Sequence, residues 1–161
     1  MVRNTSGAML RLSKLTDYAV VVLARLSSGT PSQTSPQTSP RIAASTGIPE
    51  PTVAKVLKTL VAAGLVTSQR GAHGGYRLTR PLGALPIADV IEAIDGPIAL
   101  TACVEGAGLG CDVGTLCPMR GRWDPVNTAI REALGAITLA DMQHSARPSR
   151  LHPLNPSPAI E

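Results

Sequence analysis

Aromatic side chains and long apolar runs are scarce in this sequence. Its 161 residues include one Trp, two Tyr and no Phe, although hydrophobic residues make up 43% of the chain. A core of this kind is built from Val, Leu, Ile and Ala, which favours packed helices over a β-sandwich. The longest apolar run, residues 19–24, is far shorter than the roughly 20 residues that cross a bilayer. No export signal precedes it, so we expect a cytoplasmic protein without a membrane span.

Cysteine is also scarce, and all three cysteines lie in one glycine-rich stretch, residues 103–117. An odd number of thiols cannot pair completely, and a cytoplasmic chain keeps its thiols reduced. The spacing lacks the paired C-x2-4-C knuckles of a structural zinc site. Iron–sulfur clusters are held by thiolates at more variable spacing. A cluster, a zinc ion, redox-active thiols and no role at all therefore stay open on the cysteines alone.

Charge is divided unevenly along the chain. Residues 41–82 contain six Lys or Arg and one acidic residue, whereas residues 83–142 contain three basic and eight acidic residues. Concentrated positive charge favours a polyanion such as DNA, while scattered charge only aids solubility. The split indicates two units with different partners.

The basic part has the pattern of a helix-turn-helix. A first helix is expected over residues 12–28, and a short second one over about residues 39–46, with Ser39 as its cap. Gly47 ends it, and a further helix starts near Pro51 with apolar residues at positions 53, 56, 57, 60 and 61. The opposite face of this helix carries no acid, and its side chains can reach phosphates and base edges: Thr52, Lys55, Lys58 and Thr59.

A glycine-rich basic hairpin is expected directly after these helices. Leu65–Gln69 and Tyr76–Thr79 alternate as strands do, and the turn RGAHGG between them carries Arg70 and His73. A hairpin in this place is typical of a wing, which follows the DNA backbone or enters the minor groove.

The acidic part is expected to hold two more helices on either side of the cysteines. The first has a stripe from Ile87 to Ile94 and ends at Gly96. The second is longer, and Thr138 with Asp141 caps its last turn. Its apolar side consists of Trp123, Val126, Ile130, Leu134 and Ile137. This side covers its own domain or pairs with a second copy. Since DNA readers of this size dimerise to match two half-sites, we expect a homodimer.

Several stretches together resemble a known family of regulators. They are LRLSKLTDYAVVVLARL, IAASTGIPEPTVAKVLKTLVAAGLVTSQRGAHGGYRLTR, IADVIEAIDGP, the three spaced cysteines and ITLADM, in this order. They resemble the Rrf-type winged-helix regulators, the family that includes the iron–sulfur regulator IscR and the nitric-oxide sensor NsrR. The resemblance covers about residues 10–142, apart from the Ser/Pro-rich stretch. Within the family, LSKLTDYAVVVL and CPMRGRWDPVNTAIREAL are most similar to the regulator of the SUF cluster-assembly operon.

The resemblance implies a homodimeric repressor of iron–sulfur cluster assembly (SUF) genes with one [2Fe–2S] cluster per subunit. Cys103, Cys111 and Cys117 match the family's cluster ligands. Some members take a fourth ligand from a histidine three residues after the last cysteine, where this chain has Arg120, which stays protonated and cannot ligate iron. Other members use an aspartate in the first helix of the partner subunit, and Asp17 stands at that position.

The resemblance also points to DNA contacts. Arg70 matches the wing arginine that enters the minor groove, and Ala54 replaces a glutamate with which IscR tunes its choice of site. Residue pattern and resemblance together give these candidate DNA-binding residues: Pro51, Thr52, Lys55, Lys58, Arg70, His73 and Tyr76.

The expected fold is mainly α with a small β-hairpin wing, a winged helix-turn-helix followed by a C-terminal dimerisation helix. Its expected parts are a flexible leader (1–9), a DNA-binding domain (10–82) with a flexible insertion (27–39), a cluster-binding loop with the dimerisation helix (83–142), and a disordered tail (143–161).

No set of residues in the chain has the pattern of an active site. We find no Ser–His–Asp set, no phosphate loop and no paired carboxylates, and we expect no enzyme. Two alternatives to a cluster-sensing regulator remain: a nitric-oxide or redox sensor of the same family, and a zinc- or thiol-based DNA-binding regulator without a cluster.

Overall fold

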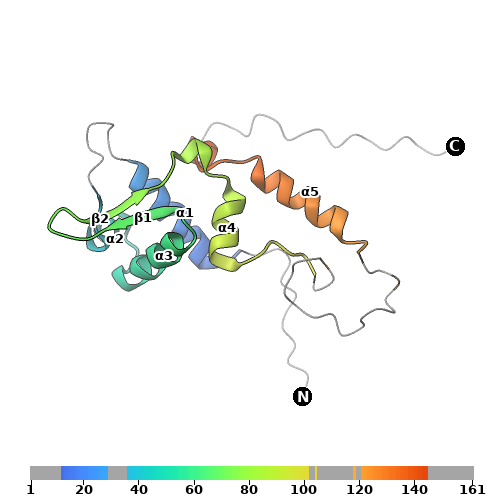
Figure 1. Ribbon diagram of the computed structural model, residues 1–161, viewed down its shortest axis with the longest axis horizontal. Helices are drawn as coiled ribbons and strands as arrows, with labels where there is room; N and C mark the ends of the chain where they lie inside the picture. Colours follow the sequence, from blue (N-terminus) through green and yellow to red (C-terminus); the bar gives the residue numbers. More distant parts are fainter. Residues whose placement is uncertain (1–11, 29–35, 102–103, 105–117, 119–120, 145–161) are drawn as a thin grey trace, which may run out of the picture.

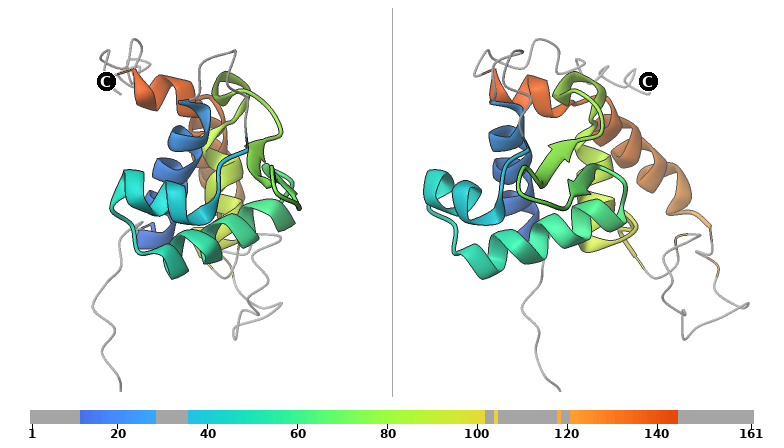
Figure 2. Two further views of the ribbon diagram at one scale, coloured as in Figure 1. Left: turned by 90° about the vertical axis from the view of Figure 1, so that its left-hand side faces the viewer. Right: turned by 60° about the vertical axis from the view of Figure 1, so that its left-hand side comes forward.

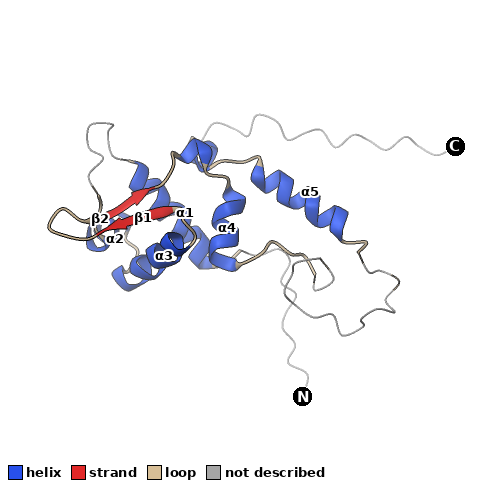
Figure 3. Cartoon of the chain, viewed as in Figure 1, coloured by secondary structure: helices blue, strands red, loops and turns tan. Residues whose placement is uncertain are grey.

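Helices dominate the computed structural model, which describes residues 12–28, 36–101, 104, 118 and 121–144 (Figures 1 and 3). In chain order the elements are α1 (Lys14–Ser27), α2 (Ser39–Thr46), α3 (Glu50–Ala62), β1 (Val66–Gln69), β2 (Gly75–Leu78), the 3-10 helix η1 (Leu82–Ala84), α4 (Ile87–Asp95), α5 (Asp124–Gly135) and α6 (Leu139–Gln143). The two strands form one antiparallel sheet. The predicted mainly α fold with a small hairpin is confirmed.

Helix α1 lies at the centre and packs against α2, α3 and α4. Ser13 caps it, because its hydroxyl accepts a hydrogen bond from the backbone N–H of Thr16 at 3.3 Å. Ala19, Val22 and Leu23 are fully buried on one side of the helix, as the spacing of apolar residues predicts.

The pair α2 and α3 forms the predicted helix-turn-helix. Gly47 ends α2 at φ +74°, a left-handed conformation that glycine adopts without the cost a Cβ would impose. The N-cap of α2 is Thr38, not Ser39; the Ser39 hydroxyl instead donates to the Glu50 carboxylate at 2.7 Å, and so joins the first turns of the two helices. The other face of α3 is turned to solvent, because its apolar stripe is buried. The buried residues of the stripe are Val53, Val56, Leu57 and Leu60.

The hairpin is extended by a third segment that comes just before α2. Gln37 and Tyr76 exchange two backbone hydrogen bonds, of 3.1 and 2.9 Å, and the Gln37 amide donates to the carbonyl of Arg25 at 3.1 Å. A Cβ at Gly75 would lie 2.8 Å from the Gln37 carbonyl oxygen, so this strand needs glycine. Gln37 falls within the insertion expected over residues 27–39, yet it is buried and holds the hairpin against the end of α1.

Helix α5 packs against α4, whereas α6 packs against η1 and α1 (Figure 2). Thr138 pairs with Pro86, and α6 begins there with a capping box in which Thr138 and Asp141 bond each other's backbone N–H. The longer helix predicted from residue 122 onward ends at Gly135, and the capped turn is a separate helix, α6. On α5, Ile130 and Leu134 pack against the core. Val126 on α5, Trp123 just before it and Ile137 after it remain 39–45% exposed.

Candidate nucleic-acid interface and metal-binding segment

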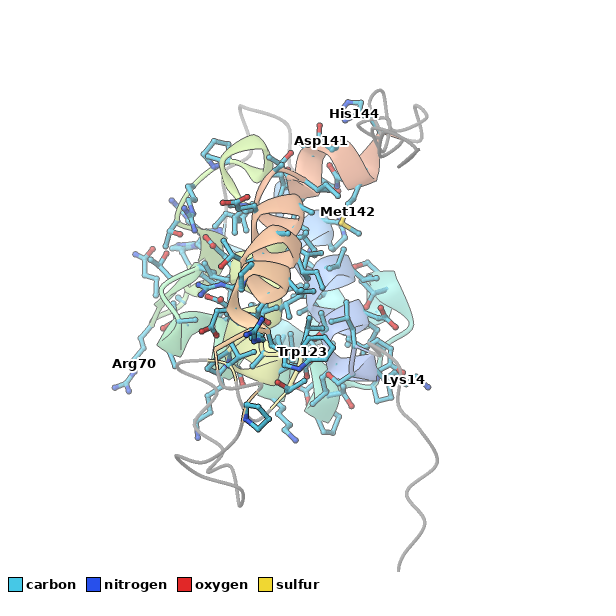
Figure 4. All side chains as sticks on the ribbon, turned by 90° about the vertical axis from the view of Figure 1, so that its right-hand side faces the viewer. Lys14, Arg70, Trp123, Asp141, Met142 and His144 are labelled. Atoms are coloured by element: carbon cyan, nitrogen blue, oxygen red, sulfur yellow. The ribbon has the colours of Figure 1, made fainter. Side chains whose placement is uncertain are left out.

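Helix α3 and the hairpin carry exposed positive charge next to each other. Lys55 and Lys58 are exposed on α3, which packs against β1, and Arg70 and His73 are exposed in the turn between the strands. Figure 4 shows Arg70 directed away from the body of the protein. Long cationic side chains in such positions suit the phosphates and grooves of a duplex.

The remaining candidate DNA residues lie in different surroundings. Pro51 is exposed and Thr52 half-buried in the first turn of α3. Tyr76 is half-buried and packs against the core, while its backbone pairs with Gln37. The arrangement gives Tyr76 a part in holding the wing, and a DNA contact by its side chain stays a prediction.

The single acid in the basic part, Glu50, is held in place at the start of α3. A carboxylate in the first helical turn is favoured by the helix dipole, and Ser39 adds a hydrogen bond to it. Among the described residues the ion pairs are Arg80–Asp89 and Arg131–Glu92. Neither pair involves a cation of α3 or of the hairpin turn, so the charge of this face is not neutralised by them.

The three cysteines, Cys103, Cys111 and Cys117, fall outside the described residues. Within the described part, no group of three or more His, Cys, Asp or Glu side chains is arranged to hold a metal ion. Asp17 is exposed in the first turn of α1, one residue from the buried Thr16. The three cysteines are chemically suited to hold an iron–sulfur cluster, because soft thiolates are the ligands that such clusters take.

Asp95, the last residue of α4, ties the start of the cysteine-bearing segment to α1. Its carboxylate accepts hydrogen bonds from the backbone N–H of Ser13 at 3.0 Å and from the Thr16 hydroxyl at 2.8 Å. A carboxylate is disfavoured at the C-terminal end of its own helix but favoured at the N-terminal end of another. Partial burial raises the pKa of Asp95, but the hydrogen bonds from Ser13 and Thr16 outweigh it and leave the pKa below the ordinary value.

Asn127 ties the same segment to α5. It is the one buried residue of α5, 4% exposed. Its amide donates to the carbonyl of Ile98 at 2.9 Å and accepts from the N–H of Leu100 at 3.0 Å. Sequence reasoning missed both Asp95 and Asn127. For Asn127 one signal was available, its position three and seven residues before Ile130 and Leu134, which places it on the apolar face of the helix but does not indicate its partners.

These elements define a class of protein. A helix-turn-helix followed by a basic antiparallel hairpin is a winged helix-turn-helix, a fold that presents its second helix to the major groove and its wing to the adjacent backbone. The protein is therefore of the DNA-binding regulator class.

The chain belongs to the Rrf2 family, described as iron-dependent transcriptional regulators, whose model matches residues 12–145. It is 36% identical over 148 residues to a protein of Mycobacterium tuberculosis (strain ATCC 25618 / H37Rv) named HTH-type transcriptional regulator Rv1287, covering 88% of this chain and 86% of that one. The family resemblance and the winged-helix fold expected from the sequence are both confirmed.

Two solved structures extend the comparison. The global cysteine regulator CymR of B. subtilis superposes with a TM-score of 0.62 at 27% identity, covering 83% of this chain and 96% of that chain. IscR of T. potens superposes with a TM-score of 0.58 at 30% identity, covering 83% and 86%. None of the described helices is long and apolar enough to span a membrane.

The Asp95 contact predicts a pH dependence of stability. Because its folded-state pKa is lowered, the contact stabilises the fold above the ordinary pKa of 3.8 and is lost as the pH falls through the lower folded-state value. We expect Asp95→Asn to lower the free energy of unfolding by about 0.5 kcal/mol at pH 7, because the amide oxygen still accepts both hydrogen bonds but the negative charge at the N-terminal end of α1 is lost. Below about pH 4 the difference from wild type should shrink.

Chemical denaturation of the metal-free protein between pH 3 and pH 7 measures this effect. The matched control is Glu132→Gln, which removes an exposed carboxylate from α5. A constant difference between Asp95→Asn and wild type over this range would contradict the linkage.

Proposed function

We propose that the chain is a cytoplasmic, homodimeric repressor that senses an iron–sulfur cluster and controls cluster-assembly (SUF) genes. The observation that supports this proposal most directly is the place where the segment with all three cysteines starts. It follows α4, whose last residue, Asp95, accepts hydrogen bonds from the first turn of α1. Helix α1 in turn packs against both helices of the helix-turn-helix. The similarity of residues 12–23 and 117–134 to the SUF-operon regulator supports the choice of target genes.

Cys103, Cys111 and Cys117 would hold a [2Fe–2S] cluster, with Asp17 as the fourth ligand. When bound, the cluster would supply sensitivity to oxidants, nitric oxide and iron supply. The oxygen of Asp17 suits this position because the residue is exposed on the turn of α1 next to the Asp95 contact. Whether Asp17 serves its own subunit or, as the family resemblance implies, the partner subunit is part of the proposal.

The protein's own residues would carry the state of the segment to DNA. Asp95 fixes the start of α1 against α4, and the buried face of α1 fixes α3. A change in the cysteine-bearing segment would therefore alter the position of α3 in one subunit relative to α3 in its partner. Since half-sites lie about one helical turn apart on DNA, the distance between the two α3 helices decides the affinity for DNA.

Metal analysis tests the cofactor. Protein purified without air should contain iron and sulfide in equal amounts and absorb visible light, and Cys111→Ser should lose both, because three thiolates are the main anchors. His73→Ala is the matched control, since it removes a metal-binding side chain from the exposed wing turn. Zinc without sulfide would show the zinc-based alternative instead, and equal operator affinity of loaded and cluster-free protein would overturn sensing.

The dimer would form through the apolar residues that α5 and α6 leave exposed. Val126, Ile137 and Met142 are 45, 44 and 49% exposed and Trp123 is 39% exposed. Figure 4 shows Trp123 near the start of α5 and Met142, on α6, near the other end of that helix, and in Figure 1 α5 lies on the side of the molecule away from the hairpin turn. Such a strip on a surface helix marks an interaction site.

A charge within this strip should separate the subunits. We expect Val126→Asp to be a folded monomer by sedimentation, because pairing would bury an unpartnered carboxylate at a cost of several kcal/mol. Ser68→Asp adds the same charge to exposed β1 and should remain a dimer. A Val126→Asp protein that stays dimeric would place the interface elsewhere.

Salt-dependent DNA binding tests the basic face. Arg70→Ala should weaken duplex binding about tenfold and reduce the slope of log K against log salt by about 1, as loss of one phosphate or minor-groove contact does. Arg131→Ala removes the same charge from α5, where it pairs with Glu92, and should leave the slope unchanged. If the two substitutions weaken DNA binding equally, Arg70 makes no specific contact with DNA and contributes only to the net charge.

A further inference from the structure

We propose that Asn127 is the positioning residue that joins the two ends of the cysteine-bearing segment. The contact of its amide with Ile98 and Leu100 is hereafter called the Asn127 clip. This inference rests on the proposed function for its consequence, the retention of a cluster, while the clip itself consists of protein groups alone.

The burial of Asn127 argues for a specific role. Helix α5 buries no apolar side chain fully, and its most buried residue is this amide. Burial of an amide costs free energy unless each polar atom is paired. Both the donor and the acceptor of Asn127 are paired, and both partners are backbone groups.

The position of the clip in the chain gives it a consequence for the cysteines. Leu100 and Asn127 are 27 residues apart, and all three cysteines lie between them. Joining the ends of a chain segment reduces the conformational entropy that remains to be lost when the residues inside are ordered. The clip therefore lowers the cost of bringing three thiolates to one site, which is preorganisation of a ligand set.

Neighbouring residues support an anchored start of the segment. Ile98 is buried at 9% exposure and Val104, directly after Cys103, is buried at 7%. The N–H of Val104 donates to the carbonyl of Thr101 at 3.2 Å. Val104 thus follows the clipped Leu100 by four positions and is itself buried and hydrogen-bonded to Thr101.

Amide exchange in the cluster-free protein tests the clip directly. The variant Asn127→Leu keeps the size of the side chain and removes both hydrogen bonds, while Asn127→Asp keeps the acceptor for Leu100 and loses the donor to Ile98. We expect Asn127→Leu to raise the exchange rate of the Leu100 amide at least about tenfold while the amides of α1 and α3 keep their rates. Thr128→Ala, the exposed neighbour on the same helix, should leave Leu100 unchanged.

Cluster retention tests the consequence. After anaerobic loading, iron release to a chelator should be about tenfold faster in Asn127→Leu than in wild type, a change typical of residues that orient metal ligands. Asn127→Asp should release iron at least as fast as Asn127→Leu, because its buried carboxylate would face the Ile98 carbonyl oxygen without a donor between them. The affinity of the cluster-free variants for DNA should equal that of cluster-free wild type.

The outcomes separate this inference from the proposed function. An unchanged Leu100 amide in Asn127→Leu overturns the inference, as does an equal rise in exchange over all helices, which would mean a purely global loss of stability. Unchanged iron release with a faster Leu100 amide also overturns it, because the clip would then not serve the ligands. Wild-type protein that takes up no iron or sulfide refutes the proposed function, while the amide measurements still decide whether Asn127 orders the segment.

Discussion

The packing of α4 against α1 is the constraint on which the rest of the structure depends. With so few aromatic residues, the core consists of aliphatic side chains from short helices. Helix α1 buries Ala19, Val22 and Leu23 fully and packs against α2, α3, α4, α6, β2 and η1. Helix α4 closes this core with Val90 and Ile91. Asp95 then fixes the relative position of the two helices at one end. Helix α4 also packs directly against α3, so the α1–α4 contact and the α3–α4 contact both link the segment beyond α4 to the helix-turn-helix.

The division of charge follows the same architecture. The cations of α3 and of the hairpin turn lie on one side of the α1–α4 joint, whereas the acids of α4 and α5 lie on the other, in part paired with Arg80 and Arg131. Repulsion between phosphates and the acidic part favours a single orientation on a duplex. The split between the basic and acidic parts of the sequence is therefore also a spatial separation, with the cations of α3 and the hairpin turn on one side and the acids of α4 and α5 on the other.

Periodic features were predictable from sequence, and individual polar contacts were not. The apolar spacing of α1, α3 and α4 and the glycine that ends α2 act over neighbouring residues, so local rules locate these helices within a few positions. The Ser39 cap was misplaced by one residue, because a long-range partner, Glu50, takes the hydroxyl. Asp95 and Asn127 bond residues 79 to 82 and 27 to 29 positions away, and no local pattern indicates such partners. The cysteines, Asp17 and the DNA contacts remain predictions from residue chemistry and resemblance.

The placement of Trp123 gives this molecule a built-in optical probe. It is the single tryptophan of the chain, it precedes the first residue of α5, and it is partly exposed on the apolar strip (Figure 4). Indole emission shifts with the polarity of its surroundings and is quenched by nearby coloured groups. Because only two tyrosines compete with it, the intrinsic fluorescence of the unlabelled protein originates from the junction between the cysteine-bearing stretch and the helix that follows it. Events at that junction can thus be followed in real time without attaching a dye.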